Sequence, residues 1–191
     1  NIPFLTIPLL NSKDIRIVLQ SPKPLSIPKN PFGSPSIGSK LAPIKIIEFA
    51  DFGCSHCRDA HVSLKKLMKD ELKDKIQLTY RYYPLNMKSI SKDAAVAAYC
   101  SSKQGKFWGY IDSLYENHRR LSPPLFNQLA KKHYLDLAKF KVCTSSMTAH
   151  KAVDMDRNIG DSLGVKSTPL IVVNGKVFQG VPTLHELEDL L

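Results

Sequence analysis

The sequence predicts an α/β protein whose sheet is interrupted by an inserted α-helical domain. A strand pattern at residues 44–50 is followed by a helical pattern and then by a second strand pattern at residues 76–83. Helical segments fill the middle of the chain, and strand patterns return only after Gly164. In this order, one half of the sheet precedes the helical insertion in the sequence and the other half follows it.

The composition is that of a globular protein. The chain has 191 residues, of which 43% are apolar and 23% are charged. No apolar run in the sequence approaches the roughly 18 residues that would span a bilayer. The net charge of +10 comes from 27 basic residues, 21 of them Lys, which are scattered rather than clustered. We therefore expect a Lys-rich surface and no nucleic-acid partner.

Residues 1–40 form a proline-rich arm. Eight of the thirteen prolines fall within the first 43 residues, so helix is nearly excluded there. Alternating apolar and polar residues allow one short strand at residues 14–20. The chain starts with Asn and a short apolar segment without a basic flank. We expect from this a processed N-terminus from which a signal peptide has been removed.

The first half of the sheet surrounds the sequence CSHC. Residues 44–50 are rich in β-branched side chains, as in a buried strand. Apolar side chains in residues 60–72 then recur at helical spacing, with Lys on the opposite side. Residues 76–83 form the next strand, which Pro84 ends. These segments make a βαβ unit in which Cys54 lies near the N-terminus of the helix.

Residues 85–160 are expected to form the inserted helical domain. Three helical patterns lie at residues 89–105, 106–120 and 124–135. They are followed by a long polar stretch, residues 136–163, which we expect to be broken mainly by turns. The sheet domain is then discontinuous and comprises residues 41–84 and 161–191.

The end of the chain completes the sheet. Two short strands at residues 170–173 and 177–179 flank Asn174-Gly175, a dipeptide that suits a type I′ hairpin turn. A last amphipathic helix follows Pro182. The order of strand, CxxC, helix, strand, helical insert, hairpin and helix is typical of a thioredoxin-like fold with an inserted helical domain.

The CSHC motif could bind a metal or exchange disulfides. Cys54, Cys57 and His61 could supply three zinc ligands, but a structural zinc site needs a second pair of ligands at similarly tight spacing. Cys100 and Cys143 have no ligand-type neighbour within four residues. We therefore expect no metal site.

A redox role explains more of the sequence around this motif. A thiol at a helix N-terminus faces unpaired N–H groups and the positive end of the helix dipole, which favour the thiolate. His56, in the Ser55-His56 loop between the cysteines, would add to this effect on Cys54. A stabilised reduced pair tends to oxidise other thiols.

Glu48 and the Thr168-Pro169 dipeptide lie where such chemistry would use them. Glu48 precedes Cys54 by six residues on a strand and could exchange a proton with Cys57. The sequence is equally compatible with a partly solvated Glu48 at the edge of the sheet. Pro169 comes at the start of a strand, where proline is tolerated, and the residues alone leave its isomer open.

Three separated motifs resemble the DsbA-like family of exported thiol–disulfide oxidoreductases. IIEFADFGCSHC is similar to the family's strand, buried acid and CxxC, and AAYCSSKQGKFWGYIDSLY is similar to its helical domain. LGVKSTPLIVVNGKVFQG is similar to its cis-proline strand and hairpin. The resemblance covers residues 30–191, in the family's order.

The resemblance implies a role for several residues. Cys54 would be the cysteine that attacks and is attacked, and Cys57 would resolve the mixed disulfide. Pro169 would be cis and face the active site. Thr168 would offer its backbone to an extended substrate.

The resemblance also implies a second disulfide. Some family members join matching segments of the helical domain, so a Cys100–Cys143 bond is expected. The alternative is a pair of small buried thiols.

The expected function is the introduction of disulfides into exported proteins by dithiol–disulfide exchange at Cys54 and Cys57, without a cofactor. The expected partners are reduced or misoxidised exported proteins and a membrane quinone-linked reoxidase of the DsbB type, and the expected location is the periplasm or another exported compartment, with the protein soluble.

Two alternatives remain open. Thr168 resembles isomerase-type relatives, which favours a disulfide isomerase or reductase with a reductant-delivering partner, in which the N-terminal arm could mediate self-association. A non-catalytic module that binds client proteins is the third possibility.

Overall fold

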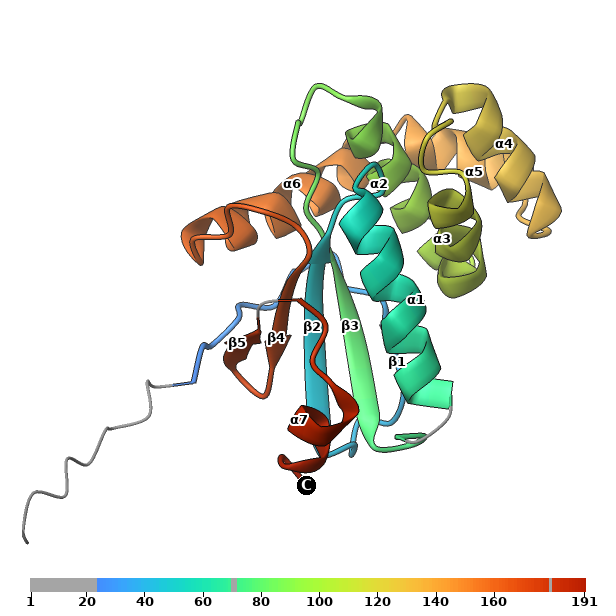
Figure 1. Cartoon of the computed structure of the whole chain (residues 1–191). Coiled ribbons are helices and arrows are strands. Elements are labelled where there is room, and N and C mark those ends of the chain that lie inside the picture. Colours follow the sequence, from blue (N-terminus) through green and yellow to red (C-terminus); the bar gives the residue numbers. More distant parts are fainter. Residues whose placement is uncertain (1–23, 70–71, 179) are drawn as a thin grey trace, which may run out of the picture.

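The computed structural model describes residues 24–69, 72–178 and 180–191 and contains one five-stranded mixed sheet in the order β1-β3-β2-β4-β5 (Figure 1). The strands are β1 (Ser36–Ile37), β2 (Ile44–Ala50), β3 (Ile76–Tyr82), β4 (Leu170–Val173) and β5 (Lys176–Phe178). The helices are α1 (Ser55–Lys69), α2 (Ile90–Ser102), α3 (Phe107–Glu116), α4 (Pro123–Lys132), α5 (Leu137–Thr144), α6 (Met147–Ser162) and α7 (Leu184–Glu188).

The sheet is organised around β2. This strand pairs in parallel with β3, because α1 carries the chain back across the sheet, and pairs antiparallel with β4. The predicted βαβ unit is therefore confirmed. Glu48 lies opposite Tyr80 of β3 and Ile171 of β4, so these three side chains share one face of the sheet.

Helices cover both faces. On the face that contains Ile46 and Leu78, α1 buries Leu64 and α7 buries Leu187. On the other face, Ile159 of α6 packs with buried side chains of β2 and of the end of β3. Figure 1 shows α1 and α6 on opposite sides of the strands. The resulting fold is thioredoxin-like, as predicted.

Gly160 allows α6 to approach the sheet closely. A Cβ atom at this position would lie 2.5 Å from the ring of Tyr83 and 3.3 Å from the ring of Phe49. Both rings are buried, so neither can move aside without disturbing the core. A side chain at position 160 would therefore push the helix away from the strands.

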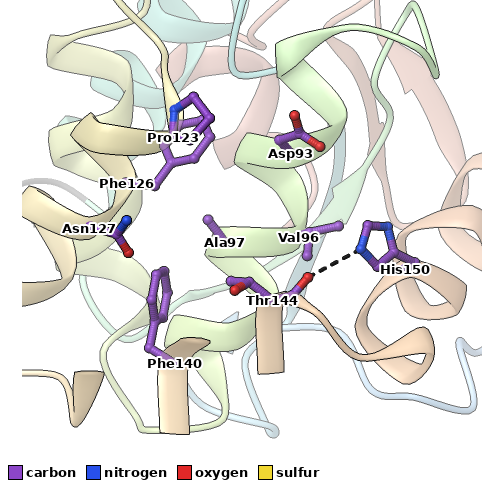
Figure 2. A pocket seen from close by; sticks show the side chains of 9 residues that line it. All are labelled: Asp93, Val96, Ala97, Pro123, Phe126, Asn127, Phe140, Thr144 and His150. Carbon is purple, nitrogen blue, oxygen red and sulfur yellow. Dashed lines mark hydrogen bonds between the residues drawn. The ribbon is translucent and has the colours of Figure 1, made fainter. Parts of the chain in front are cut away.

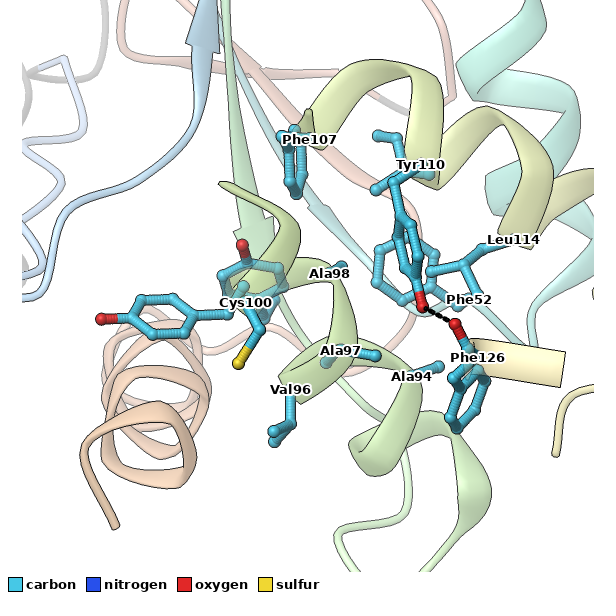
Figure 3. Close-up of a cluster of buried hydrophobic side chains, with 14 of the residues drawn as sticks. Phe52, Ala94, Val96, Ala97, Ala98, Cys100, Phe107, Tyr110, Leu114 and Phe126 are labelled. Carbon is cyan, nitrogen blue, oxygen red and sulfur yellow. Dashed lines mark hydrogen bonds between the residues drawn. The ribbon is translucent and has the colours of Figure 1, made fainter. Parts of the chain in front are cut away.

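Helices α2 to α5, with the first half of α6, build the helical insertion around an aromatic core (Figure 3). Phe52, just before the CxxC, lies in the same core as Phe107 and Leu114 of α3. The Tyr110 hydroxyl donates to the Phe126 carbonyl oxygen at 3.0 Å, which ties α3 to α4. The helical insertion and the loop before the CxxC thus share one core.

The polar stretch at residues 136–163 is broken by turn residues 145–146, as expected, but both parts of it are helical. Two capping residues explain the difference. The side chain of Asp136 accepts from the Lys139 N–H at 3.0 Å and starts α5, and the side chain of Ser146 accepts from the Ala149 N–H at 3.2 Å and starts α6. Helix α6 runs through residue 160, where the sequence placed the end of the insertion.

The hairpin between β4 and β5 agrees with its sequence. Asn174 and Gly175 both have positive φ, at 47° and 82°, as a type I′ turn requires. The Asn174 side-chain oxygen accepts from the Lys45 N–H at 2.8 Å, which also holds the turn against β2.

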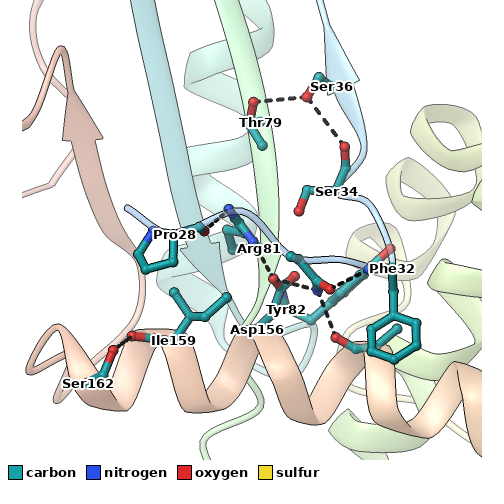
Figure 4. A network of polar contacts seen from close by, with 12 residues as sticks. Pro28, Phe32, Ser34, Ser36, Thr79, Arg81, Tyr82, Asp156, Ile159 and Ser162 are labelled. Carbon is teal, nitrogen blue, oxygen red and sulfur yellow. Dashed lines mark hydrogen bonds and ion pairs between the residues drawn. The ribbon is translucent and has the colours of Figure 1, made fainter. Parts of the chain in front are cut away.

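A buried polar network fastens the arm to the sheet and α6 (Figure 4). Arg81 of β3 donates to Asp156 of α6 at 2.7 Å and to the Pro28 carbonyl oxygen at 2.7 Å. The Tyr82 N–H and the Asn30 amide also donate to the Asp156 carboxylate, at 3.1 and 2.8 Å. Asp156 therefore joins three segments that are distant in the sequence.

The arm also contributes an unpredicted strand. Strand β1 pairs antiparallel with β3 and extends the sheet at that edge. The short strand expected at residues 14–20 lies outside the described residues.

Candidate redox site

The two cysteines of CSHC lie at the start of α1. Cys54 immediately precedes Ser55, the first residue of the helix, and Cys57 lies within the first turn. Both thiols are free, Cys54 is partly exposed, and Cys57 is fully buried. Only the first sulfur is therefore open to a large substrate, and it lies where the backbone N–H groups of the helix lack partners within the helix.

Asp51 shapes the loop that delivers Cys54. One carboxylate oxygen accepts from the Gly53 N–H at 2.7 Å, and the other accepts from the Leu85 N–H at 2.8 Å. The carbonyl oxygen of Asp51 accepts from the Cys54 N–H at 3.2 Å. Sequence reasoning did not single out Asp51, although an Asp two residues before a turn Gly is a known signal of such a local bond.

The Asp51 backbone also reaches the second cysteine. Its N–H lies 3.5 Å from the Cys57 sulfur, within the range of a hydrogen bond to sulfur.

The Thr168–Pro169 peptide bond is cis and lies beside the cysteines. The Cys54 thiol donates to the Thr168 carbonyl oxygen at 3.5 Å. Thr168 thus contacts the partly exposed cysteine through its backbone oxygen.

A shallow groove of about 350 Å³ lies next to this bond. His56, Asp59 and Ala60 line it from α1, and Thr168, Pro169 and Val181 line it from the opposite side. Ser55 and His56 are both exposed. An extended chain lying in this groove would pass the Cys54 sulfur.

Burial makes the Cys57 thiol a poor acid. Loss of solvent raises its pKa well above the ordinary value, while the nearby Thr168 hydroxyl and the Asp51 N–H lower it in part. A thiolate on Cys57 is therefore costly, and its formation requires a nearby group that exchanges protons.

Glu48 is a buried acid on β2, the strand that precedes the CxxC. Its side chain is 0% exposed, and burial raises the pKa of its carboxyl group from 4.5 to about 8. The partly solvated position that the sequence left open is therefore excluded. A carboxyl group with this pKa can donate or accept a proton near neutral pH.

Two buried tyrosines stand beside Glu48. The hydroxyls of Tyr80 and Tyr115 are 2.8 Å apart. Burial raises the pKa of both tyrosines, and the charges of an ionised Glu48 and of a Cys57 thiolate raise it further.

His61, which the sequence offered as a zinc ligand, is buried. Its Nε2 atom lies 2.6 Å from Asp112 of α3, and Lys65 donates to the second oxygen of that carboxylate at 2.5 Å. These contacts join α1 to α3.

Cys100 and Cys143 are joined by a disulfide bond that connects α2 to α5, with a sulfur–sulfur distance of 2.01 Å. This bond lies in the helical insertion.

A separate small cavity of about 170 Å³ lies among α2, α4, α5 and α6 (Figure 2). Apolar side chains such as Val96, Phe126 and Phe140 form much of its wall, and His150 contacts the Thr144 carbonyl oxygen at 3.2 Å. None of the residues that contact the two free cysteines lines this cavity.

Within residues 24–69, 72–178 and 180–191, no three His, Cys, Asp or Glu side chains are grouped as metal ligands would be. None of the helices in these ranges has the length and apolar character needed to cross a membrane.

Comparisons with known proteins agree with this geometry. The profile of the thioredoxin family matches residues 32–191. A probable disulfide bond formation protein D of Bacillus cereus is 31% identical over 156 residues, covering 74% of this chain and 70% of that protein. The crystal structure of oxidised BdbD from Bacillus subtilis has a TM-score of 0.74 at 23% identity and covers 87% of this chain and 95% of that chain.

A different group of relatives is much longer than this chain. The Na(+)/H(+) antiporter NhaA 3 of Salinispora tropica is 28% identical over 164 residues, which are 85% of this chain and 25% of the antiporter. The chain therefore spans about a quarter of the length of the antiporters that it matches.

Proposed function

Because this chain belongs to the DsbA-like thiol–disulfide oxidoreductases of the thioredoxin superfamily, we propose that it oxidises pairs of thiols in exported client proteins. The observation that carries the proposal is the contrast between its two free cysteines. Cys54 is partly exposed at the start of α1 and beside a groove, whereas Cys57 is fully buried. One sulfur can meet a client, and the other can close the disulfide.

The first step is an exchange at Cys54. A client thiolate in the groove attacks the Cys54 sulfur of the oxidised protein, the Cys54–Cys57 bond breaks, and Cys57 leaves as a thiolate. The Thr168 carbonyl and the cis-Pro169 would hold the client backbone near Cys54. His56 and Ser55, at the exposed start of α1, would adjust the environment of the Cys54 sulfur.

The second step releases the product. A second client thiolate attacks the client sulfur of the mixed disulfide, and Cys54 leaves as a thiolate. The negative charge on this sulfur faces the N-terminal end of α1, which favours it. Two electrons have then passed from the client to the protein, and the client holds a new disulfide.

Glu48 would supply the proton that the first step requires. With a pKa of about 8 its carboxyl group is mostly protonated at neutral pH, so it can protonate the departing Cys57 thiolate. When the protein is reoxidised, the same carboxylate can take the proton back.

The partners follow from this chemistry. A protein reduced in each cycle needs an oxidant, which in this family is a membrane quinone-linked reoxidase of the DsbB type. We propose an exported location, such as the periplasm, where client thiols become oxidised.

Replacement of Cys54 tests the proposal. We expect Cys54→Ala to abolish oxidation of a reduced model substrate with two thiols, measured by the loss of free thiol, while the folded state persists. Activity at the wild-type level in this variant would favour the non-catalytic client-binding module instead.

A disulfide isomerase is the second candidate, because Thr168 precedes the cis-Pro169, which resembles the isomerase-type relatives. The reduction potential of the Cys54–Cys57 pair separates the two directions. An oxidase needs a potential above that of the glutathione pool, so a value near or below that pool, together with reactivation of a scrambled substrate, would identify an isomerase.

A further inference from the structure

Glu48 has no direct way to exchange protons with solvent. Its side chain is fully buried, and among the described residues neither carboxylate oxygen has a hydrogen-bond partner. A group that donates one proton in every cycle must nevertheless recover it. A route between this carboxyl group and water is therefore required.

Of the two residues paired with Glu48 in the sheet, one has a polar group that could pass a proton. On the β4 side its paired residue is Ile171, an apolar side chain that cannot carry a proton. On the β3 side its paired residue is Tyr80, whose buried hydroxyl lies on the same face of the sheet. The polar path therefore leads toward β3 and α3.

The Tyr80 hydroxyl is continued by that of Tyr115. The two oxygen atoms are 2.8 Å apart, and either can donate to the other. The ring of Phe52 packs on both tyrosines, with ring centroids 5.4 Å from Tyr80 and 5.1 Å from Tyr115. The pair is thus held in a fixed arrangement and shielded by an aromatic ring.

Tyr115 borders a pocket of about 300 Å³ between α1 and α3. The pocket is also lined by His61 and Asp112, which are 2.6 Å apart, and the His61 ring lies 4.9 Å from the Tyr115 ring. These side chains and the Lys65 ammonium group place polar groups in the wall of a pocket that is large enough for water. The inner tyrosine pair therefore ends at a site where protons can be exchanged.

We propose that the hydroxyls of Tyr80 and Tyr115 carry protons between Glu48 and the pocket lined by His61 and Asp112. This step rests on the proposed function, in which Glu48 protonates Cys57. After that transfer, Tyr80 passes its hydroxyl proton to the Glu48 carboxylate and receives one from Tyr115. Tyr115 is in turn reprotonated from the pocket. One proton moves from solvent to Glu48, and both tyrosines end neutral.

Glu48 and the Tyr80 hydroxyl are not hydrogen-bonded to each other, so the first transfer requires one bridging water or a rotation of the Glu48 side chain.

The charged groups around the path come from two helices. Helix α1 contributes Cys57, Arg58, His61 and Lys65, and α3 contributes Asp112 and Glu116. The pocket, and not the tyrosine pair, is lined by Arg58, Lys65 and Glu116. Their charges therefore act on the step in which the pocket gives a proton to Tyr115.

Single hydroxyl deletions test the path. Tyr80→Phe and Tyr115→Phe keep the aromatic rings, and Tyr110→Phe is the matched control, because its buried hydroxyl donates only to the Phe126 carbonyl oxygen among the described contacts. We would measure at pH 6 the rate of repeated cycles in which a small dithiol reduces each protein and a small disulfide reoxidises it, because Glu48 regains its proton only after each reduction, and we would also measure the reduction potential. The two test variants should react about tenfold more slowly, with an unchanged potential, and the control should match the wild type.

A rate at the wild-type level in both test variants, or a potential that shifts together with the rate, would overturn the proposal. The wild-type protein provides a second measurement that does not depend on a variant. In mixtures of H2O and D2O its rate should curve with the deuterium fraction, because several protons move, and a linear dependence would contradict the path.

Cys54→Ala is measured beside these variants to separate the two proposals. If that protein still exchanges disulfides, the proposed function itself fails. If it is inactive while Tyr80→Phe and Tyr115→Phe react at the wild-type rate, only the proton path fails.

Discussion

The sulfur of Cys54 lies 3.5 Å from the carbonyl oxygen of Thr168, although 114 residues separate them in the chain. Strand β2 makes this contact possible, because it pairs with β3 on one side and with β4 on the other. The CxxC follows β2 and the cis-proline precedes β4. The chain thus passes through α1, β3 and the helical insertion between the two residues of this contact.

Cys57→Ala should trap client proteins on Cys54. The variant is first loaded with glutathione as a mixed disulfide on Cys54, and a reduced client with a single thiol then displaces glutathione as its thiol. Neither Cys57 nor a second client thiol can then release the client, so complexes that reducing agents break should accumulate, and non-reducing electrophoresis measures them. Trapping on Cys54→Ala to the same extent would show that another cysteine reacts.

Glu48→Gln should change how stability depends on pH. The pKa of Glu48 is about 8 in the folded protein against an ordinary value of 4.5. Between these values the unfolded chain is ionised while the folded protein stays protonated, so the wild type loses stability as pH rises from about 4.5 to 8. Gln cannot ionise, so the variant should gain on the order of 3 kcal/mol relative to the wild type between pH 4 and pH 7.

Urea unfolding of reduced wild-type and Glu48→Gln proteins at several pH values checks this difference. The absolute stability of the variant also contains the cost of a buried amide, which is independent of pH, so only the trend is compared. A difference that stays constant from pH 4 to pH 8 would contradict the raised pKa.

Removal of the Cys100–Cys143 bond should lower stability and leave the chemistry intact. The bond closes a loop with a sequence separation of 43 residues, so replacement of both cysteines by Ala should cost about 2–4 kcal/mol of the free energy of unfolding. Disulfide exchange at Cys54 should continue below the unfolding transition. Loss of exchange in the folded variant would instead assign this bond a part in the reaction.

Asp156→Ala should be strongly destabilising. The replacement leaves the buried Arg81 guanidinium without its 2.7 Å partner and removes the acceptor of the Tyr82 N–H. An unpaired buried charge costs about 3–5 kcal/mol. Chemical denaturation measures this loss.

Asp154→Ala is the matched control on the same helix. Asp154 is paired with Lys92 at 2.7 Å near the surface, so its loss should cost less than about 1 kcal/mol. Equal costs for the two variants would mean that the Asp156 network does not hold the arm and sheet together.

Local patterns were sufficient for the parts of the protein whose structure depends on neighbouring residues. The strand before the CxxC, the helix after it and the Asn174-Gly175 turn were all predicted, because periodicity and turn preference act over a few residues. Such patterns failed at residues 136–163, where polar composition concealed two helices that Asp136 and Ser146 cap.

The order of the elements and the place of the reactive cysteines at the start of a helix follow from local sequence patterns. The burial of Glu48, the hydrogen bond between Tyr80 and Tyr115, and the contact of His61 with Asp112 depend on the packing of distant segments. The pKa of a carboxyl group depends on the solvent that remains around it, and that solvent is removed by helices and strands far away in the chain. The reactive cysteines could therefore be found in the sequence, whereas the groups that control their protons could be found only in the fold.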